Sequence, residues 1–315
     1  MARAAAESAA RAARPVAAPS VAEGGARGGD GPGPTLTIGG VVPAILVVLV
    51  VGALLRVLLG LVLYPQDGLW SDIKLFTQWS LTLADGGPGV FYTQVSWTDY
   101  TPGYLWVLWA HGLAAKLVAG LTGGAAPEII GPWLKLPALV IDLLVAVVFY
   151  RAIRRWHSEA WGVTVAAVWL LLPVTWVDSA LWGQVDAVGV LLGGLALIWL
   201  IDRRPELAAG MAMAAVLAKP QFGVFLPVVG LVLLRRHGRL WTVAPSELAD
   251  APEDDWRSTL RSWWARTDRD GPVRLVTSAL VAFVVLLAMT VPFDLESRAP
   301  AGLAGIPVVG DLAGL

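Results

Sequence analysis

Residues 70–104, WSDIKLFTQWSLTLADGGPGVFYTQVSWTDYTPGY, follow the first long apolar run of the chain and combine acids, aromatic residues and turn formers. A Ser-Asp pair ending at Asp72 is typical of a helix start, because serine caps a helix and a carboxylate favours its first turn. Ile73, Phe76 and Leu83 then fall on one side of a helix with a 3.6-residue period. This pattern predicts an amphipathic helix that lies at a membrane surface and does not cross it.

The composition outside this stretch is that of an integral membrane protein. The chain is 57% hydrophobic and only 15% charged. Its net charge of −1 indicates no nucleic-acid partner. The absence of cysteine excludes disulfides and thiolate metal sites. We therefore expect an all-α polytopic membrane protein whose first partner is the lipid bilayer.

The N-terminal residues 1–40 are rich in Ala, Arg, Gly and Pro, which predicts a disordered tail. The apolar run 41–63 comes too late and is too long for a signal peptide. At about 1.5 Å per residue it is long enough to cross a bilayer. We expect it to be a retained first span that carries Arg56 in its outer half.

Basic residues predict the sidedness of the later segments, because loops rich in Arg and Lys stay in the cytoplasm. They follow or precede the third, fifth, seventh and last apolar segments, as at Arg151, Arg203, Arg235 and Arg274. The candidate segments are 41–63, 104–121, 133–150, 160–177, 185–202, 206–219, 221–235 and 275–292.

If 1–40 and 151–159 are both cytoplasmic, an even number of crossings separates them, so one of the three segments between them does not cross. Segment 104–121 contains His111 and Lys116 and follows a Pro-Gly turn, so we expect an interfacial or re-entrant helix there. About seven spans result, with the N-terminus inside. The predicted organisation is a core at 41–236 with an outer loop at 65–132, a cytoplasmic loop at 237–274, a last span at 275–292 and an outer end at 293–315.

Asp72 is the first candidate for chemistry, because it lies just outside the first span with Trp70 and Trp79 nearby. A carboxylate acts as a general base when it reaches the proton that it removes, and partial burial raises its basicity. The alternative is a first-turn carboxylate that only stabilises a surface helix.

A second motif, Trp182-Gly183-Gln184-Val185-Asp186, precedes a span on the outer side. Gln184 and Asp186 are candidates to hydrogen-bond sugar hydroxyls. The alternative is an interfacial Trp, a glycine turn and an acid in the first helical turn.

Cations inside apolar segments form the third group of candidates. Lys219 and Gln221 flank Pro220, which predicts a break between 206–219 and 221–235. Lys135 falls near the outer end of its segment, two turns before Asp142. A Lys at a cavity rim suits a phosphate, and snorkelling to the headgroups is the alternative. Arg56 is either a second such cation or the partner of Asp142.

No histidine-based metal site is predicted, because His157 and His237 fall on the cytoplasmic side, away from His111. We expect no resident cofactor. A divalent cation stays open as an alternative, and carboxylates would have to hold it.

Taken together, these residues resemble the polyprenyl-phosphate-sugar-dependent glycosyltransferases of the GT-C superfamily. The similarity is to actinobacterial membrane mannosyltransferases and, more remotely, to the dolichyl-phosphate-glucose glucosyltransferases of the endoplasmic reticulum. It covers roughly residues 41–235 and rests on the order and sidedness of the motifs. These are Trp70-Ser71-Asp72, Asp99-Tyr100-Thr101-Pro102-Gly103-Tyr104, Lys135 with Asp142, Trp182-Gly183-Gln184-Val185-Asp186, and Lys219-Pro220-Gln221.

The resemblance implies an inverting transfer of a hexose, with mannose favoured, from a polyprenyl-phosphate donor to an extracytoplasmic hydroxyl. The acceptor would be a glycan, a lipid or a protein, and the membrane a bacterial plasma membrane. Asp72 would be the general base. Substrate binding would fall to Asp99, Tyr100, Lys135, Gln184, Asp186, Lys219, Gln221 and Arg56.

Two departures from the family pattern stand out. Thr101 occupies the place of the first proline of a Pro-Pro turn, and family members carry more spans and a further outward portion. We therefore expect either the N-terminal part of a longer enzyme or a shortened relative, which includes an inactive one. A transporter of a lipid-linked or polar solute is the other alternative, although the chain lacks the internal repeat that this class usually has.

Overall fold

Helices account for most of the residues described by the computed structural model, which are 37–38, 42–65, 72–238 and 271–293. A short antiparallel ladder precedes them, in which β1 (Thr37–Ile38) pairs with β2 (Val42–Pro43). The expected all-α class is thus confirmed for this part of the chain. The predicted tail, the cytoplasmic loop and the outer end lie outside the described residues, apart from short margins.

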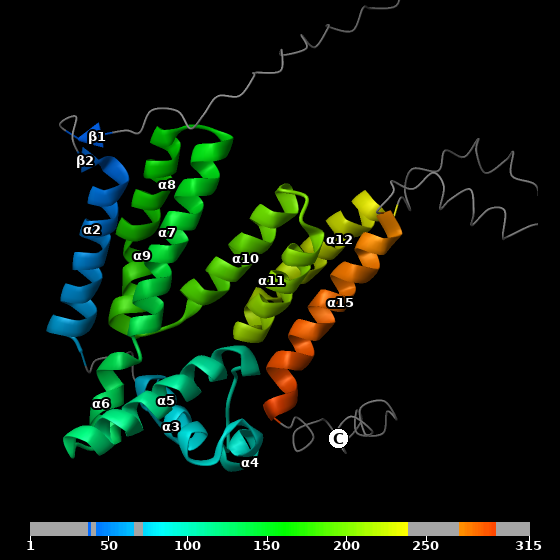
Figure 1. Cartoon of the computed structure of the whole chain (residues 1–315). Helices are drawn as coiled ribbons and strands as arrows, with labels where there is room; N and C mark the ends of the chain where they lie inside the picture. The colour runs from blue at the N-terminus through cyan, green and yellow to red at the C-terminus, as the bar shows by residue number, and fades with distance from the viewer. Residues whose placement is uncertain (1–36, 39–41, 66–71, 239–270, 294–315) are drawn as a thin grey trace, which may run out of the picture. The chain divides into compact units, whose positions relative to one another are not determined.

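One set of helices runs side by side, as Figure 1 shows. Ion pairs join neighbouring ends within this set: Arg155 of α7 donates to Asp202 after α10 at 2.6 Å, and Arg274 of α15 donates to Glu206 of α11 at 2.9 Å. The set comprises α2 (Ala44–Val57) with its continuation η1 (Leu58–Leu63), α7 (Leu136–Trp156), α8 (Glu159–Leu171), α10 (Asp186–Ile201), α11 (Pro205–Ala218), α12 (Phe225–His237) and α15 (Gly271–Thr290).

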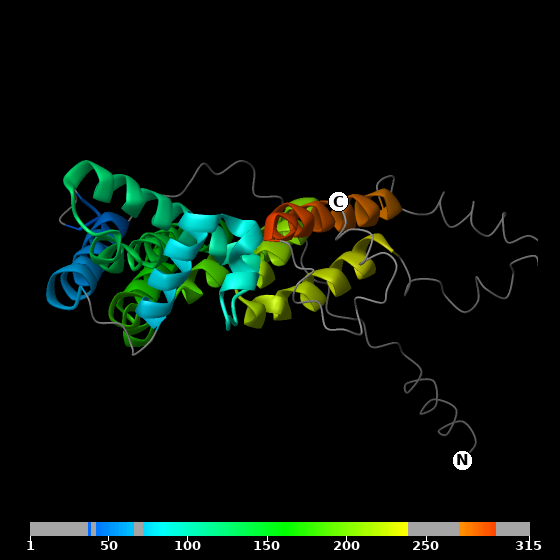
Figure 2. The same ribbon diagram turned by 90° about the horizontal axis from the view of Figure 1, so that it is seen from below.

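The segments between α2 and α7 gather at one end of this set, as Figures 1 and 2 show from two directions. They are α3 (Asp72–Gly86), η2 (Pro88–Val90), α4 (Phe91–Gln94), α5 (Pro102–Thr122) and α6 (Ala126–Trp133). Two side chains tie this end layer to the last turns of the set. Thr101 Oγ1 donates to Leu217 O at 2.6 Å, and Trp106 Nε1 donates to Met289 O at 3.1 Å.

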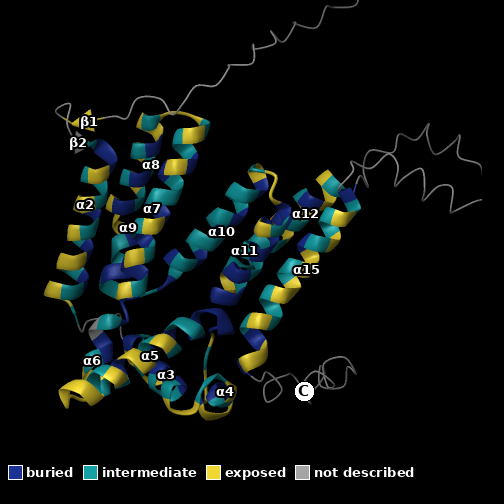
Figure 3. Ribbon diagram, viewed as in Figure 1, coloured by how far each residue is buried: buried dark blue, intermediate teal, exposed yellow. Residues whose placement is uncertain are grey.

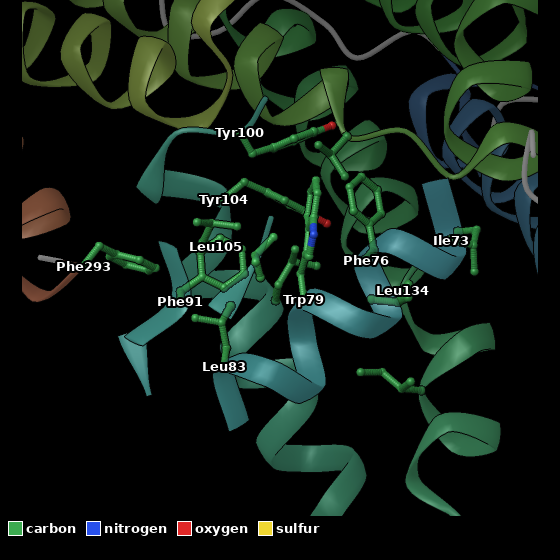
Figure 4. Packing of buried hydrophobic residues seen from close by; sticks show 14 of the residues in the cluster. Ile73, Phe76, Trp79, Leu83, Phe91, Tyr100, Tyr104, Leu105, Leu134 and Phe293 are labelled. Atoms are coloured by element: carbon green, nitrogen blue, oxygen red, sulfur yellow. The ribbon is translucent and has the colours of Figure 1, made fainter. Parts of the chain in front are cut away.

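The end layer has an apolar core of its own, drawn in Figure 4. Ile73, Phe76 and Leu83 of α3 are buried in it, which confirms the predicted inward side of that helix. Aromatic rings fill much of the remaining space, as where Phe76 meets Tyr100 edge-on with ring centroids 5.4 Å apart. Figure 3 shows the contrast with α2 and α15, whose outward sides stay exposed.

The last helix closes this core from a distant part of the sequence. Phe293, in η5 (Val291–Phe293) directly after α15, is fully buried. Its ring meets those of Phe91 and Trp106 edge-on, at centroid distances of 6.4 and 5.5 Å. Residues about 190 positions apart therefore form one core, and the turn after α15 completes the core of the end layer.

Fewer of the described helices are long and apolar enough to cross a membrane than the seven spans expected. By length and composition, four described helices could cross a membrane, or five if the bent pair Glu159–Leu171 and Pro173–Trp182 is one span. The expected seven included Asp186–Ile201 and Pro205–Ala218, which have only 16 and 14 residues. A 14-residue helix covers about 21 Å, less than the roughly 30 Å hydrocarbon core. The sequence overestimated the number of spans because basic residues indicate where a helix ends but not how long it is.

The helix Pro102–Thr122, which we expected not to cross, is one of the four that pass the test of length and composition. Its surroundings distinguish it from the other three. Its first turn abuts the end of α11, where a Cβ on Gly103 would overlap the Leu217 carbonyl. Figure 1 shows it running across the ends of the helical set and not alongside them.

Candidate functional site

A cavity of about 150 Å³ opens in the end layer, where it meets the helical set. Four separate parts of the chain contribute its polar lining: the start of α3, the segment before α5, the loop before α10 and the segment after α11. The lining residues are Asp72, Leu75, Phe76, Trp79, Trp97, Asp99, Tyr100, Gln184 and Lys219. Five of the residues predicted from the sequence as site residues therefore face one space.

Asp72 is the first residue of α3 and is held by two donors from one loop. Trp182 Nε1 donates to Asp72 Oδ2 at 2.7 Å, and Gln184 Nε2 donates to the same oxygen at 2.5 Å. Both donors lie more than 100 positions away in the sequence. The predicted helix start at Asp72 is confirmed, and its carboxylate has specific partners beyond its own helix.

Gly183 allows this loop to approach α3 so closely. Its φ of 84° is in the left-handed region, which residues with a side chain rarely adopt. A Cβ at this position would lie 2.6 Å from Cδ1 of Ile73. In the order Trp-Gly-Gln, one hydrogen-bond donor precedes the glycine and one follows it. The glycine between them can fit against the first turn of α3.

Gln184 joins Asp72 to the opposite wall of the cavity. Its Oε1 accepts from the Tyr100 hydroxyl at 3.1 Å and from Lys219 Nζ at 3.0 Å. Burial raises the pKa of the Tyr100 hydroxyl, and Tyr104 and Asp186 nearby add to the effect. Tyr100 therefore keeps its proton at neutral pH and acts as a hydrogen-bond donor.

Lys219 makes a second contact, to the carboxylate at the start of α10. Its Nζ donates to Asp186 Oδ1 at 2.7 Å and lies 5.7 Å from the centre of the Tyr100 ring. Gln221 Nε2 reaches the same Asp186 oxygen at 3.2 Å. Asp186 and Gln221 therefore belong to the site through Lys219 and form no part of the cavity wall.

Lys219 lies at the break between two helices, at the position that the sequence predicted. α11 ends at Ala218, and the 3-10 turn η4 (Pro220–Val224) starts with the proline. Lys219 between them has extended backbone, with φ −157° and ψ 126°. Thr101 Oγ1 caps the open end of α11 by donating to Val216 O and Leu217 O. Thr101, which departs from the expected Pro-Pro turn, thus has a structural role of its own.

Arg56 and Asp142 form a buried ion pair away from the cavity. Arg56 Nε donates to Asp142 Oδ2 at 2.7 Å, and both side chains are 1% exposed. Arg56 Nη1 also donates to Leu170 O, and Ser179 Oγ donates to Asp142 Oδ2 at 2.6 Å. Of the two alternatives for Arg56, the structure therefore shows the pairing with Asp142.

Lys135 is also buried, directly before α7, and its Nζ donates to Tyr64 O at 2.6 Å just after η1. Neither Lys135 nor Arg56 lines the cavity. In this arrangement the two cations lie outside the lining of this cavity, and their assignment to substrate binding stays a prediction. Both connect the C-terminal part of the first helix and η1 to the neighbouring helices.

Among the residues that the structure describes, no group of three or more His, Asp or Glu side chains is placed to hold a metal ion. Asp72 and Asp99 are the two carboxylates in the cavity wall. His111 contacts the carbonyl of Val107, one turn earlier in its own helix, through Nδ1 at 2.8 Å.

Two site residues did not emerge from the sequence. Trp182 was interpreted as an interfacial aromatic, whereas its indole N–H donates to Asp72. Trp97 lines the cavity and is 58% exposed. The signal for Trp182 was its place in the same motif as Gln184. Trp97 follows a turn and belongs to no periodic pattern. Only its closeness to Asp99 in the sequence could have indicated that it is a site residue.

Comparisons with known proteins add no family to this description. No protein-family model matches the chain, and no curated protein and no solved structure matches it either.

Proposed function

We propose that the protein is a membrane glycosyltransferase that moves one hexose, with mannose favoured, from a polyprenyl-phosphate donor to an acceptor hydroxyl. One observation carries this proposal. The acid, amide, phenol and cation that the sequence pattern singled out converge on one cavity with aromatic walls. Pockets with apolar and aromatic walls and a few directed polar groups are the usual form of small-molecule sites.

The size of the cavity supports a single sugar unit. An engineered protein cavity of about 150 Å³ encloses one benzene molecule, so a space of this volume admits no more than one sugar ring, and a hexose, with twice the heavy atoms of benzene, would extend beyond its mouth. The cavity here has about this volume, and its lining combines polar and apolar side chains. Trp79 and Trp97 supply flat apolar surfaces, and Asp72, Asp99 and Gln184 supply hydrogen-bonding groups for hydroxyls.

Asp72 is the proposed general base. It lies in the cavity wall, and its carboxylate is held in a fixed orientation by two N–H donors. In this role it removes the proton of the acceptor hydroxyl as that oxygen attacks the anomeric carbon, and the bond to the donor phosphate breaks.

Lys219 is the proposed partner of the leaving phosphate. Among the described residues it is the cation in the cavity wall, and its side chain is only 14% exposed. A fixed cation in a poorly solvated site stabilises a developing negative charge far more than one in water. Because Lys135 and Arg56 are buried elsewhere, we assign this contact to Lys219 alone.

The charge distribution supports an extracytoplasmic site. Arg154, Arg155 and Arg274 lie at the end of the helical set away from the cavity, where they pair with Glu159, Asp202 and Glu206 respectively. The cavity end carries Asp72, Asp99 and Asp186. Under the positive-inside rule the arginine end is cytoplasmic, and the cavity then faces the other side.

The direct test supplies radiolabelled polyprenyl-phosphate mannose and glucose to membranes that contain the chain. We expect one label to move to a glycan, lipid or protein acceptor. Asp72→Asn keeps an oxygen that can accept both hydrogen bonds but removes the basicity, so it should lower turnover by about 10²–10⁴-fold. Donor affinity should change little.

Asp85→Asn is the matched control, because Asp85 is on the same helix and 68% exposed, in an ion pair with Lys116. It should leave the transfer rate unchanged. A well-expressed Asp72→Asn variant that transfers sugar at the parental rate would exclude Asp72 as the base. Uptake of unmodified donor into vesicles, without any transfer, would favour a transporter.

A further inference from the structure

We infer that Gln184 is a positioning residue that couples Lys219 to Asp72, so that the loop Trp182–Gln184 acts as a clamp on the carboxylate. This inference rests on the proposed function for the roles of the two charged groups. The clamp itself rests on the four contacts of the Gln184 and Trp182 side chains alone.

The contacts of Gln184 require the two ends of an amide. Nε2 faces a carboxylate, which can only accept, and Oε1 faces a protonated hydroxyl and an ammonium, which both donate. A Glu at this position would suit Lys219 and Tyr100 but would repel Asp72. An apolar side chain would leave all three without this partner. The chemistry of the surroundings therefore selects Gln.

The clamp acts on one oxygen of Asp72. The indole N–H of Trp182 and the amide N–H of Gln184 both donate to Oδ2. Two donors on one oxygen fix the plane of the carboxylate and stabilise its negative charge. The second oxygen, Oδ1, is then the one that accepts the proton of the acceptor hydroxyl.

The clamp is anchored from the opposite side by the buried ion pair. Trp182 ends the π-helical segment η3 (Val177–Trp182), and Ser179 in that segment donates to Asp142 Oδ2 at 2.6 Å. Asp142 is held by Arg56 at 2.7 Å. A supporting layer of hydrogen bonds of this kind is what keeps a reacting group in a productive orientation.

The coupling has a direct consequence for the donor. A phosphate that binds Lys219 competes with Gln184 Oε1 for the ammonium protons, and the amide contacts Asp72 through its other end. Donor binding therefore weakens the hold of the clamp on Oδ2. A carboxylate with weaker hydrogen bonds has a higher proton affinity, while the Trp182 donor, which does not contact Lys219, keeps its orientation. The base is therefore more effective when the donor is in place, provided that its orientation is kept.

Gln184→Glu tests the clamp, since it keeps the acceptor for Lys219 and Tyr100 but replaces the donor to Asp72 with a second carboxylate. We expect kcat to fall at least tenfold at neutral pH, because the repelled Asp72 carboxylate loses its orientation, and the KM for polyprenyl-phosphate mannose to rise, because the new carboxylate competes with the donor phosphate for Lys219. The acid limb of the pH–rate profile should move up by at least about one pH unit, because two adjacent carboxylates resist ionising together. A role in folding alone would lower the yield of active protein and leave the profile in place.

A second measurement is independent of catalysis. A water-soluble carbodiimide with an amine labels protonated carboxyl groups, and mass spectrometry of the Asp72 peptide gives the pH range of labelling. Asp99, Tyr100 and Lys219 also line the cavity and Asp186 adjoins it, so the labelling must be followed at Asp72 itself. Labelling should extend to higher pH in Gln184→Glu. It should be unchanged in Gln78→Glu, the same substitution at an exposed position of α3.

Trp182→Phe serves as the second variant if Gln184→Glu does not fold. It removes the other donor and keeps an aromatic ring, so the labelling range should move in the same direction by a smaller amount. If the parent transfers no sugar but the labelling shifts as expected, the proposed function fails and the clamp stands. If the parent transfers sugar and the folded variants change neither labelling nor pH profile, the clamp is wrong and the proposed function stands.

Discussion

At the scale of single residues, Lys219 and Lys116 have different surroundings. Lys219 contacts an amide, a carboxylate and the face of a tyrosine ring, whereas Lys116 pairs with Asp85 on an exposed surface. Exposed ion pairs contribute little to stability, about 0–1 kcal/mol. Snorkelling of Lys219 toward the headgroups does not by itself explain this number of partners. The partners indicate a site that holds the charge of Lys219 in place.

Lys219→Ala should raise the KM for the polyprenyl-phosphate donor and lower kcat by about tenfold or more, because the leaving phosphate loses its fixed cation. Steady-state kinetics with the labelled donor give both constants. Lys116→Ala is the control, because it is the same substitution at a lysine on an exposed surface, and it should behave as the parent. Parental kinetics in Lys219→Ala would leave that lysine with no role in the reaction.

The buried pair of Arg56 and Asp142 allows a prediction on stability. Asp142→Ala leaves the arginine charge without its carboxylate in a fully buried position, which costs about 3–5 kcal/mol. The midpoint of thermal unfolding in detergent should fall sharply. The double variant Arg56→Leu/Asp142→Leu removes both charges and should recover part of the loss. A double variant less stable than Asp142→Ala would contradict this account.

At the scale of elements, the packing of α3 against α5 depends on a close approach at Gly112. A Cβ at this position would overlap the Ser80 carbonyl of α3, and backbone atoms cannot turn away as a side chain can. Gly120, two turns later in the same helix, has open space around its Cβ position. The two glycines therefore provide a matched pair within one helix.

Gly112→Ala should destabilise the protein by about 1–3 kcal/mol, as overpacking usually does. Gly120→Ala should be neutral or stabilising by up to about 1 kcal/mol, because alanine restricts the unfolded chain and favours the helix. Thermal unfolding of both variants under one condition makes the comparison. Equal midpoints for the two variants would exclude the close contact of α3 with α5.

At the scale of the whole molecule, the position of α5 decides on which sides of the membrane the neighbouring segments lie. α5 passes a test of length and composition, yet its start is bonded to the ends of α11 and α15. If it lies across the helix ends, the segments before and after it share one side of the membrane. If it crosses, they lie on opposite sides.

Single cysteines can decide this, because the chain has none of its own. Asp85→Cys and Thr122→Cys place thiols at exposed positions before α5 and at its end, and His157→Cys places one at the far end of α7. An impermeant thiol reagent should label the first two in intact cells and the third only after permeabilisation. Protection of either Asp85→Cys or Thr122→Cys would show that α5 crosses.

The features that the sequence determined are those set by neighbours along the chain. The apolar runs predicted a helical membrane protein, the 3.6-residue period predicted the buried side of α3, and Pro220 predicted the break after α11. Each follows from local backbone geometry and from the spacing of apolar side chains. The same information overestimated the number of spans, since charge marks where helices end and leaves their length open.

Only the tertiary structure decided which polar groups meet. The contact of Asp72 with Trp182 joins residues 110 positions apart, and the pair of Arg56 and Asp142 joins residues 86 positions apart. A helical period fixes the side on which a residue lies, but not the helix that covers that side. The packing of the helices turned Arg56 and Lys135 into buried structural groups, and it brought Gln184 between Lys219 and Asp72.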